Sequence, residues 1–377
     1  MMLLAAVSLV AWLGLLFAHH GFWRADQRLA QALPQACPPV LAIVPARNEA
    51  ATVDVALRSL LTQDYLGQLT VIVVDDHSSD GTGDLARSVM LPSSGARQVV
   101  VVDAPPLPEG WSGKVGAQRA GLEAGVAVAA DSTWLWLTDA DIAHPPDVLS
   151  RLVAKAEAGR FDLVSLMVKL GTTTPAARWL VPAFVYFFQL LYPFGAVNDP
   201  KQPEAAAAGG CILVERARFE RVGGFAAIAG ALIDDVALAK LVKGAGGRLW
   251  IGLADASRCR RVYRFAELWA MVARTAFTEL RHSYVRLVAA MIGLGVVFLA
   301  PPLALALGDG AAQAAALLAW GLMAFSFVPT MRDYGLGTWR TVFLPAVALL
   351  YMAMTLDSAL THARGRGARW RGRAYGA

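Results

Sequence analysis

Long apolar runs near both ends constrain this chain more than any other feature of its sequence. The first run, Met2 to Ala18, has 17 residues and no charge. A helix rises about 1.5 Å per residue, so about 20 apolar residues cross the roughly 30 Å hydrocarbon core of a bilayer. Three more runs lie near the other end: Leu287 to Leu307, Ala311 to Val328, and Thr341 to Leu360. The sequence predicts a multi-pass membrane protein with a soluble body between the runs.

The residues around the first run favour an uncleaved anchor. The alternative is a cleaved signal peptide, which has basic residues before its apolar stretch and small residues at a cleavage site. This chain has no lysine or arginine before the run and no convincing cleavage site after it. Basic residues follow the run instead: His19, His20, Arg24 and Arg28. Positive charge favours the cytosolic side, so we expect an anchor over residues 1–22, a linker over 23–38 and a cytosolic body.

The net charge of +5 comes from the C-terminal tail, residues 362–377. This tail contains five arginines and no acid: Arg364, Arg366, Arg369, Arg371 and Arg373. Without them the basic and acidic residues are equal in number, so the body has no excess charge for binding nucleic acid. A basic segment beside a lipid surface is expected instead.

The C-terminal runs predict transmembrane helices over residues 284–361, but the charges leave their topology open. Three crossings from a cytosolic body place the arginine-rich tail outside. Arg332 and Arg340, however, favour an inside loop between the last two runs. Either one run is re-entrant or interfacial, or the tail breaks the charge rule.

A further apolar segment, residues 179–195, lies within the body and is rich in aromatic residues. Its aromatic residues are Trp179, Phe184, Tyr186, Phe187, Phe188, Tyr192 and Phe194. Such rings favour the headgroup boundary of a bilayer, so we expect an interfacial segment bounded by Pro182 and Pro193. The alternative is a buried core helix.

The start of the body alternates apolar runs with stretches typical of helices. The predicted strands are Val40–Val44, Leu69–Val74, Gln98–Val102 and Trp134–Thr138, and the predicted helices are residues 49–61, 82–89 and 116–129. Continuous rather than alternating apolar strands indicate a parallel sheet that is covered on both faces. We therefore predict an α/β, Rossmann-like domain with a mostly parallel sheet.

Polar residues, most of them acidic, follow each predicted strand. PARNE follows the first, DDHSSD the second, Asp103 the third and DAD, residues 139–141, the fourth. The carboxyl ends of parallel strands line one crevice, so these carboxylates should meet there. Because like charges repel, a divalent cation or a bound ligand is expected to compensate them.

The motifs narrow the choice of ligand. A dinucleotide-binding G-x-G-x-x-G does not follow the first strand, and no P-loop sequence occurs. Asp139 and Asp141 can instead hold one Mg²⁺ or Mn²⁺ and leave positions open for diphosphate oxygens. The sequence predicts a nucleotide site built from side chains and a metal ion.

An ordered set of motifs resembles the family 2 glycosyltransferases, which have the GT-A fold. The motifs are PARNE at 45–49, VIVVDDHSSDGT at 71–82, Gly113 with Lys114, TDAD at 138–141, GGF at 223–225 and DDVAL at 234–238. The resemblance covers residues 39–283. With its terminal apolar segments, the chain is most similar to the bacterial hopene-associated glycosyltransferases, which are themselves similar to ceramide glucosyltransferases.

The resemblance implies a role for each motif. The residues that would bind the nucleotide-sugar are Pro45, Arg47, Glu49, Asp75, Asp76, Lys114 and Asp139. Asp139 and Asp141 would hold Mg²⁺ or Mn²⁺, and Asp235, with Asp234 beside it, would be the catalytic base. Arg274 matches the arginine of a later Q-x-x-R-W motif that also serves catalysis, but Thr275 replaces its tryptophan.

These observations predict an inverting glycosyltransferase that moves a sugar from a nucleotide-sugar, a UDP-sugar by resemblance, to a membrane lipid. The resemblance implies a hopanoid or polyisoprenoid acceptor and a bacterial cytoplasmic membrane, with the catalytic domain facing the cytosol. A processive polysaccharide synthase is one alternative, and Thr275 counts against it. An inactive membrane scaffold is another, and the intact Asp139, Asp141 and Asp235 count against it. Without the family match, Asp234 and Asp235 could simply begin a helix.

Overall fold

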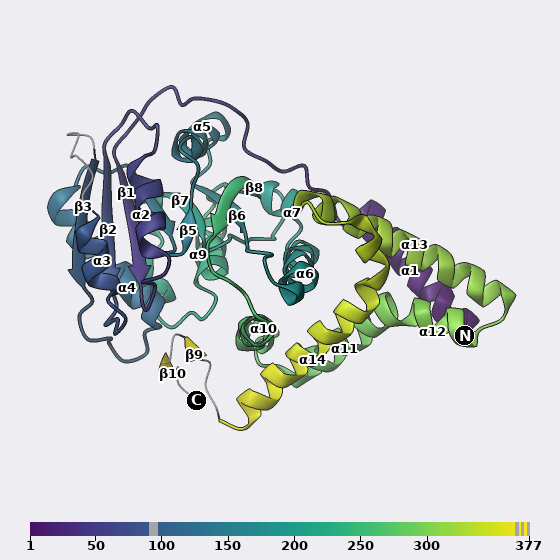
Figure 1. Cartoon of the computed structure of the whole chain (residues 1–377). Coiled ribbons are helices and arrows are strands. Elements are labelled where there is room, and N and C mark those ends of the chain that lie inside the picture. Colours follow the sequence, from purple (N-terminus) through teal and green to yellow (C-terminus); the bar gives the residue numbers. More distant parts are fainter. Residues whose placement is uncertain (90–96, 366–368, 371–372, 375–377) are drawn as a thin grey trace.

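The computed structural model describes residues 1–89, 97–365, 369–370 and 373–374. An α/β domain is joined to a bundle of long helices that extends to one side (Figure 1). Part of the predicted basic tail, including Arg366 and Arg371, lies outside the described residues. The rest of the tail includes the short strands β9 (Arg369–Trp370) and β10 (Arg373–Ala374).

The α/β domain contains an eight-stranded sheet in the order β3-β2-β1-β4-β7-β6-β8-β5. Its strands are β1 (Val40–Ala46), β2 (Leu69–Asp75), β3 (Arg97–Asp103), β4 (Trp134–Thr138), β5 (Ile142–Ala143), β6 (Leu163–Lys169), β7 (Cys211–Glu215) and β8 (Leu249–Cys259). The first four strands are parallel to one another and β6 is parallel to β8, whereas β7 and β5 run antiparallel to their neighbours. The prediction of a mostly parallel sheet is confirmed.

Helices cover both faces of the parallel strands because both faces are apolar. Along β1, Val40, Ala42 and Val44 pack on the side of α2, whereas Leu41 and Ile43 pack on the side of α4. The helices of this domain are α2 (Val53–Leu61), α3 (Thr82–Ser88), α4 (Gly113–Val128), α5 (Val148–Gly159), α8 (Arg216–Arg221), η1 (Gly224–Ile228) and α9 (Asp234–Gly244).

Two glycines allow α4 to lie close to β1. A Cβ atom on Gly121 would come within 2.6 Å of Ile43, and one on Gly125 within 2.4 Å of Leu41. A side chain at either position would push the helix away from the sheet. The close contact holds the first turn of α4, with Lys114, beside the carboxyl ends of the strands.

The helical bundle is formed by the two ends of the chain. Its elements are α1 (Met2–Ala18), α11 (Tyr284–Leu294), η2 (Gly295–Leu299), α12 (Ala300–Leu307), α13 (Gly310–Asp333), η3 (Thr338–Phe343) and α14 (Leu344–Ala363). Among the described residues, three helices are long and apolar enough to cross a membrane: Tyr284–Leu307, Gly310–Asp333 and Thr338–Ala363. These three match the predicted C-terminal spans, while α1 is a shorter apolar helix.

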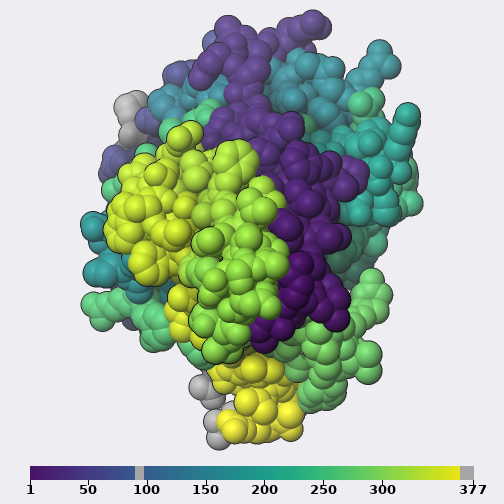
Figure 2. All heavy atoms as spheres, turned by 90° about the vertical axis from the view of Figure 1, so that its right-hand side faces the viewer, coloured from purple at the N-terminus to yellow at the C-terminus, as the bar shows by residue number. Residues whose placement is uncertain are grey.

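The N-terminal helix packs within this bundle. Figure 2 shows α1, in purple, lying along α13, in light green. The indole of Trp12 donates to the carbonyl of Val297 at 2.8 Å, and its ring lies 5.5 Å from that of Phe298. The predicted anchor therefore contacts the C-terminal helices, although membrane insertion of α1 stays a prediction.

Three helices lie between the sheet and the bundle: α6 (Pro175–Leu191), α7 (Phe194–Asn198) and α10 (Phe265–Glu279). Most of the aromatic segment belongs to α6, and Pro182 lies inside that helix rather than at its boundary, so the predicted boundary is wrong. The hydroxyl of Tyr186 is 2.7 Å from that of Ser326, and the hydroxyl of Tyr351 donates to the carbonyl of Leu180. Much of α6 is thus buried on protein, and its interfacial position stays a prediction.

An ion-pair cluster joins the two regions. Asp333, at the end of α13, pairs with Lys169 of β6 at 3.0 Å and with Arg28 of the predicted linker. Arg28 also pairs with Asp255 of β8 at 3.0 Å. The linker is therefore attached to both the sheet and the bundle, which holds the α/β domain against the helices.

Candidate active site

A cavity of about 960 Å³ lies between the carboxyl ends of β1 and β4, the start of α9, and the helices α6, α10, α11 and α14. Its wall at the sheet is polar and contains two aspartate pairs, Asp139 with Asp141 and Asp234 with Asp235. Its wall at the helices is mostly apolar. The cavity therefore connects the strand ends directly with the helices that could span a membrane.

Two basic residues compensate the first aspartate pair, which follows β4. The amine of Lys114 is 2.9 Å from Asp139 Oδ1, and Arg261 Nη2 is 3.2 Å from Asp141 Oδ2. Arg261 also binds Glu49 at 2.9 Å. Burial and the charge of Asp139 raise the pKa of Asp141, while Arg261 opposes that rise. A cation bound between the two aspartates would favour their charged forms.

The second aspartate pair begins α9, as the simple helix-start interpretation also required. Asp235 Oδ2 accepts a hydrogen bond from the backbone N–H of Gly209 at 2.7 Å, and Oδ1 accepts one from Val236. Burial, and then the charge of Asp234, raise the pKa of Asp235 to about 7, although Lys114 and the two N–H groups oppose this rise. A carboxylate with a pKa near neutrality suits a general base.

Lys114 connects the two pairs. Its amine is also 3.6 Å from Asp234 Oδ2. Burial alone would lower the pKa of this amine, but Asp139, Asp234 and Asp235 raise it above the usual value of lysine. Lys114 therefore stays charged, and it is placed where a diphosphate would need a cation.

Gly209 is a site residue that the sequence analysis missed. It precedes β7, whose Cys211 pairs with Thr138 at the end of β4. A Cβ atom here would lie 3.1 Å from both Asp235 Oδ2 and Lys114 Nζ. No motif marked this glycine, because its position depends on β7 pairing antiparallel with β4.

Only some of the predicted nucleotide-binding residues line the cavity. Pro45, Arg47 and Glu49 line the cavity at the end of β1. Asp76 is buried and its carboxylate is 3.5 Å from Arg47, so it contacts the cavity wall through that side chain. Asp75 does not belong to the residues that line the cavity, and its Oδ1 accepts a hydrogen bond from the N–H of Ser78.

Two further predictions can be compared with the structure. Asp103 does not join the expected convergence, because it is exposed and pairs with Arg87 on the surface. Arg274 does line the cavity, from α10, together with Thr275. Arg261, which the motifs did not mark, also lines the cavity.

His144 is a structural residue. It is buried, its Nε2 is 2.9 Å from the hydroxyl of Thr138, and its Nδ1 is 3.0 Å from that of Ser257. Burial lowers the pKa of His144 to about 3, so the imidazole is neutral. It supports the turn that carries Asp139 and Asp141.

The donor atoms of the first aspartate pair fit a divalent metal. Mg²⁺ and Mn²⁺ prefer carboxylate oxygens. Within the described part of the chain, no three His, Cys, Asp or Glu side chains are grouped to hold a metal ion. Mg²⁺ at phosphate sites commonly takes only one or two carboxylates and completes its shell with phosphate and water. Asp139 and Asp141 therefore fit a metal that a bound diphosphate would complete.

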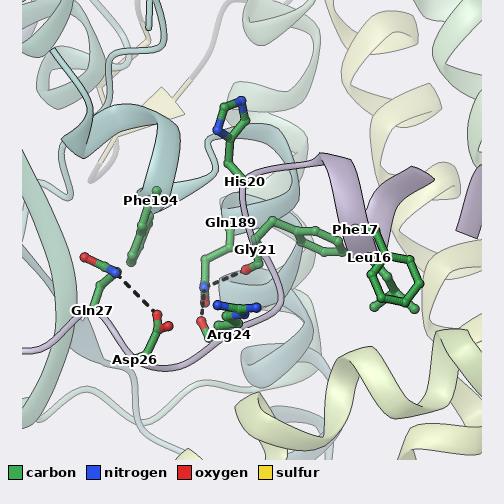
Figure 3. Close-up of a pocket in the computed structure, with 11 residues that line it drawn as sticks. Leu16, Phe17, His20, Gly21, Arg24, Asp26, Gln27, Gln189 and Phe194 are labelled. Atoms are coloured by element: carbon green, nitrogen blue, oxygen red, sulfur yellow. Dashed lines mark hydrogen bonds between the residues drawn. The ribbon is translucent and has the colours of Figure 1, made fainter. Parts of the chain in front are cut away.

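A second cavity, of about 220 Å³, lies between the end of α1 and α6 (Figure 3). There the amide of Gln189 donates to the carbonyls of Phe22 and Arg24 at 2.8 and 3.0 Å. Its lining residues differ from those of the larger cavity. Gln189 thus attaches the start of the linker to α6.

Comparison with known proteins places part of the chain in a family. Residues 41–223 match the family described as Glycosyl transferase family 2. This part of the chain is similar to that family. The matched part includes Asp139 and Asp141 but ends before Asp234 and Asp235.

One solved structure and one curated protein give further comparisons. The mannosyltransferase PcManGT from Pyrobaculum calidifontis, solved with GDP-Man and Mn²⁺, aligns with a TM-score of 0.57 and 22% identity over 96% of this chain and 99% of its own. This likeness shows a shared fold. The succinoglycan biosynthesis protein ExoO of Rhizobium meliloti is 31% identical over 136 residues, which are 34% of this chain and 35% of that protein. The chain thus matches about a third of the length of this relative.

Proposed function

We propose that this protein transfers a sugar from a nucleotide-sugar to a membrane lipid, with inversion at the anomeric carbon. One observation carries the proposal: a single cavity contains both aspartate pairs and continues between helices that are long enough to cross a bilayer. The family 2 domain supports sugar transfer. The apolar helices supply the reason for a lipid acceptor.

The donor is proposed to bind at the polar end. Arg47, Glu49 and Pro45 would contact the nucleoside, with Asp75 and Asp76 supporting that wall, and Lys114 would contact the diphosphate. Asp139 and Asp141 would hold Mg²⁺ or Mn²⁺, which when bound offsets the charge that builds on the leaving diphosphate. Arg274 lines the same cavity and can add a positive charge there. The family resemblance favours a UDP-sugar.

Asp235 is proposed to take the proton of the acceptor hydroxyl. The new bond forms between the acceptor oxygen and the anomeric carbon while the bond from that carbon to the diphosphate oxygen breaks. Because its pKa is raised to about 7, Asp235 is partly ionised at neutral pH and binds the released proton more tightly than an ordinary aspartate. Asp234 raises that proton affinity through its charge.

The acceptor is proposed to lie in the apolar part of the cavity. Phe184, Phe187 and Phe188 line it from α6, and α11 and α14 contribute small or apolar side chains. Such a wall suits hydrocarbon better than a sugar chain. The resemblance supports a hopanoid or polyisoprenoid acceptor in a bacterial cytoplasmic membrane, and Arg24 and Arg28 after α1 support a cytosolic catalytic domain.

A second candidate is transfer to a growing polysaccharide. The match to the succinoglycan biosynthesis protein ExoO favours it. The two functions differ in their product, because lipid glycosylation gives one or a few sugars on an extractable lipid, whereas a polymerase gives a long water-soluble chain. Sizing the labelled product decides between them.

The acceptor proposal can be tested at Gly293. This residue lines the cavity from α11, and a Cβ atom there would meet no atom within 4 Å. Membranes that contain the full chain are incubated with radiolabelled nucleotide-sugars and the lipids are extracted. Gly293→Phe should lower transfer to lipid at least tenfold, because the ring would occupy the acceptor's space.

Gly321→Phe is the matched control. Gly321 lies on α13, also has no atom within 4 Å of a Cβ, and is not part of the cavity wall. The Gly321→Phe variant should transfer sugar to lipid at the same rate as the unchanged chain. Label that enters only water-soluble products would contradict the lipid-acceptor proposal, and equal activity of the two variants would contradict the acceptor's position.

A further inference from the structure

A polar pair, in which Tyr192 is buried and Glu279 is partly buried, interrupts the apolar wall of the cavity. Tyr192, just after α6, donates its hydroxyl to Glu279 Oε2 at 2.6 Å, and Glu279 is the last residue of α10. Both residues line the cavity, where Leu191 and Leu280 are their neighbours in sequence and also part of the wall. The ring of Phe188 lies 5.3 Å from that of Tyr192.

The pair carries the negative charge of Glu279, which no cation in the described part of the chain contacts directly. Within the described residues no lysine, arginine or histidine forms an ion pair with Glu279, and its only hydrogen bond from a side chain comes from Tyr192. Glu279 is only partly buried, but a carboxylate in a mostly apolar wall still costs some free energy, and its hydrogen bond to Tyr192 offsets only part of that cost. A ligand group that needs a hydrogen-bond partner would explain it.

The pair lines the same cavity as Asp235. Burial, then Glu279 and Asp235, raise the pKa of Tyr192, while the exposed Arg281 opposes the rise. Tyr192 is also contacted from α9, the helix that begins with the aspartates, because Lys240 lies 5.8 Å from the centre of its ring. Tyr192 and Glu279 therefore belong to the part of the cavity wall whose charges interact with those at Asp235.

The charges around this path favour one kind of acceptor. Among the described lining residues, seven carboxylates face four cations, and Lys114 and Arg261 already contact two carboxylates each. A lipid phosphate at Asp235 would approach Asp234 and Glu279 as well, all with like charge. An uncharged hydroxyl avoids this repulsion and can donate or accept a hydrogen bond at the pair.

We propose that Tyr192 and Glu279 position the acceptor and restrict it to an uncharged lipid alcohol, with Glu279 excluding lipid phosphates. This inference rests on the proposed transfer to lipid. Tyr192 orients the carboxylate through its hydrogen bond, and neither residue takes part in proton transfer. Both are specificity-determining residues in the acceptor half of the cavity.

The charge of the product tests the inference. Membranes with the full chain are supplied with equal amounts of a polyprenol and the corresponding polyprenyl phosphate, together with a radiolabelled nucleotide-sugar. Labelled lipids are then separated on an anion exchanger. We expect at least tenfold more label in the uncharged lipids, whether the acceptor is the added alcohol or a membrane lipid. Label mainly in anionic lipids would overturn the inference but keep the proposed function, whereas no labelled lipid at all would overturn both.

Variants separate selectivity from folding. Glu279→Gln removes the charge and should raise the anionic fraction of the labelled lipid about tenfold, a gain that a misfolded protein cannot give. Glu279→Asp keeps the charge and should keep the preference for alcohols. Tyr192→Phe should raise the KM for the alcohol about tenfold with a smaller change in kcat, whereas Tyr284→Phe, on the exposed start of α11, should change neither. An unchanged anionic fraction in Glu279→Gln would overturn the proposed role.

Discussion

The two aspartate pairs lie in one cavity, yet their surroundings differ. Asp139 keeps a side chain that is 35% exposed and a direct ion pair with Lys114 at 2.9 Å. The oxygens of Asp235 instead accept hydrogen bonds from two backbone N–H groups rather than from a cation. Lys114 reaches the second pair only at Asp234, at 3.6 Å.

This difference separates two kinds of chemistry. Carboxylates that contact cations at a strand end, as Asp139 contacts Lys114 and Asp141 contacts Arg261, suit a metal ion or a diphosphate. Asp235 lies next to a like charge and is bound by N–H groups rather than by a cation, so it keeps a higher proton affinity and suits a base. The same residue type can therefore perform both tasks within one cavity, because the groups that contact each pair differ.

The largest expected effect follows from removing the base. Asp235→Asn keeps the size of the side chain and can still accept from Gly209, but it cannot take the acceptor's proton. We expect kcat to fall by about 10²- to 10⁴-fold, with little change in the KM for the donor. The measurement is the initial rate of sugar transfer to lipid at saturating donor and Mn²⁺.

Asp139→Asn is the matched variant in the other pair. It should raise the Mn²⁺ concentration needed for half-maximal activity by at least tenfold, whereas Asp235→Asn should leave that concentration within twofold. Chelation of divalent ions should abolish transfer by the unchanged chain. If both variants shift the metal requirement equally, the division of tasks between the pairs is wrong.

A smaller effect is expected from Lys114, which joins the pairs. The base works when ionised, so kcat/KM of the unchanged chain should fall tenfold per pH unit below a pKa of about 7. Lys114 lowers the pKa of Asp235, so Lys114→Met should move this acidic limb to higher pH and reduce activity at pH 7 about tenfold. Part of that activity should return at pH 8.5, which a loss of folding would not allow. A limb that moves to lower pH, or does not move, would contradict the coupling.

The sequence predicted the strand-end half of this site better than the helix-side half. Continuous apolar runs located β1, β2 and β4 to within two residues, and the rule for parallel strands brought Glu49, Asp139 and Asp141 to one edge. The rule for parallel strands failed for Asp103, because β3 lies at the edge of the sheet and its end faces solvent. A continuous apolar run predicts a strand, but it does not show which position that strand takes in the sheet.

The remaining site residues depend on contacts that are distant in sequence. Gly209 reaches Asp235 because β7 inserts antiparallel between β4 and β6, and apolar runs do not encode strand direction. Tyr192 and Glu279 meet across 87 residues, where α6 and α10 pack. The aromatic composition of residues 179–195 revealed an apolar surface, but only tertiary packing shows that part of it lines a cavity.

The smallest expected effect concerns Gly209, whose backbone lies beside both Asp235 and Lys114. In Gly209→Ala the new methyl group would lie 3.1 Å from both Asp235 Oδ2 and Lys114 Nζ, closer than most contacts of a Cβ atom. A shift of a few tenths of an ångström relieves this close contact, so we expect a loss of only about two- to fivefold in kcat, with the free energy of unfolding nearly unchanged.

Gly244→Ala is the control, because Gly244 lies at the far end of α9 and a Cβ atom there would have no atom within 4 Å. It should keep full activity and gain up to about 1 kcal/mol of stability, since alanine has fewer unfolded conformations than glycine. Equal activity of the two variants would mean that the spacing between the pairs does not limit the reaction.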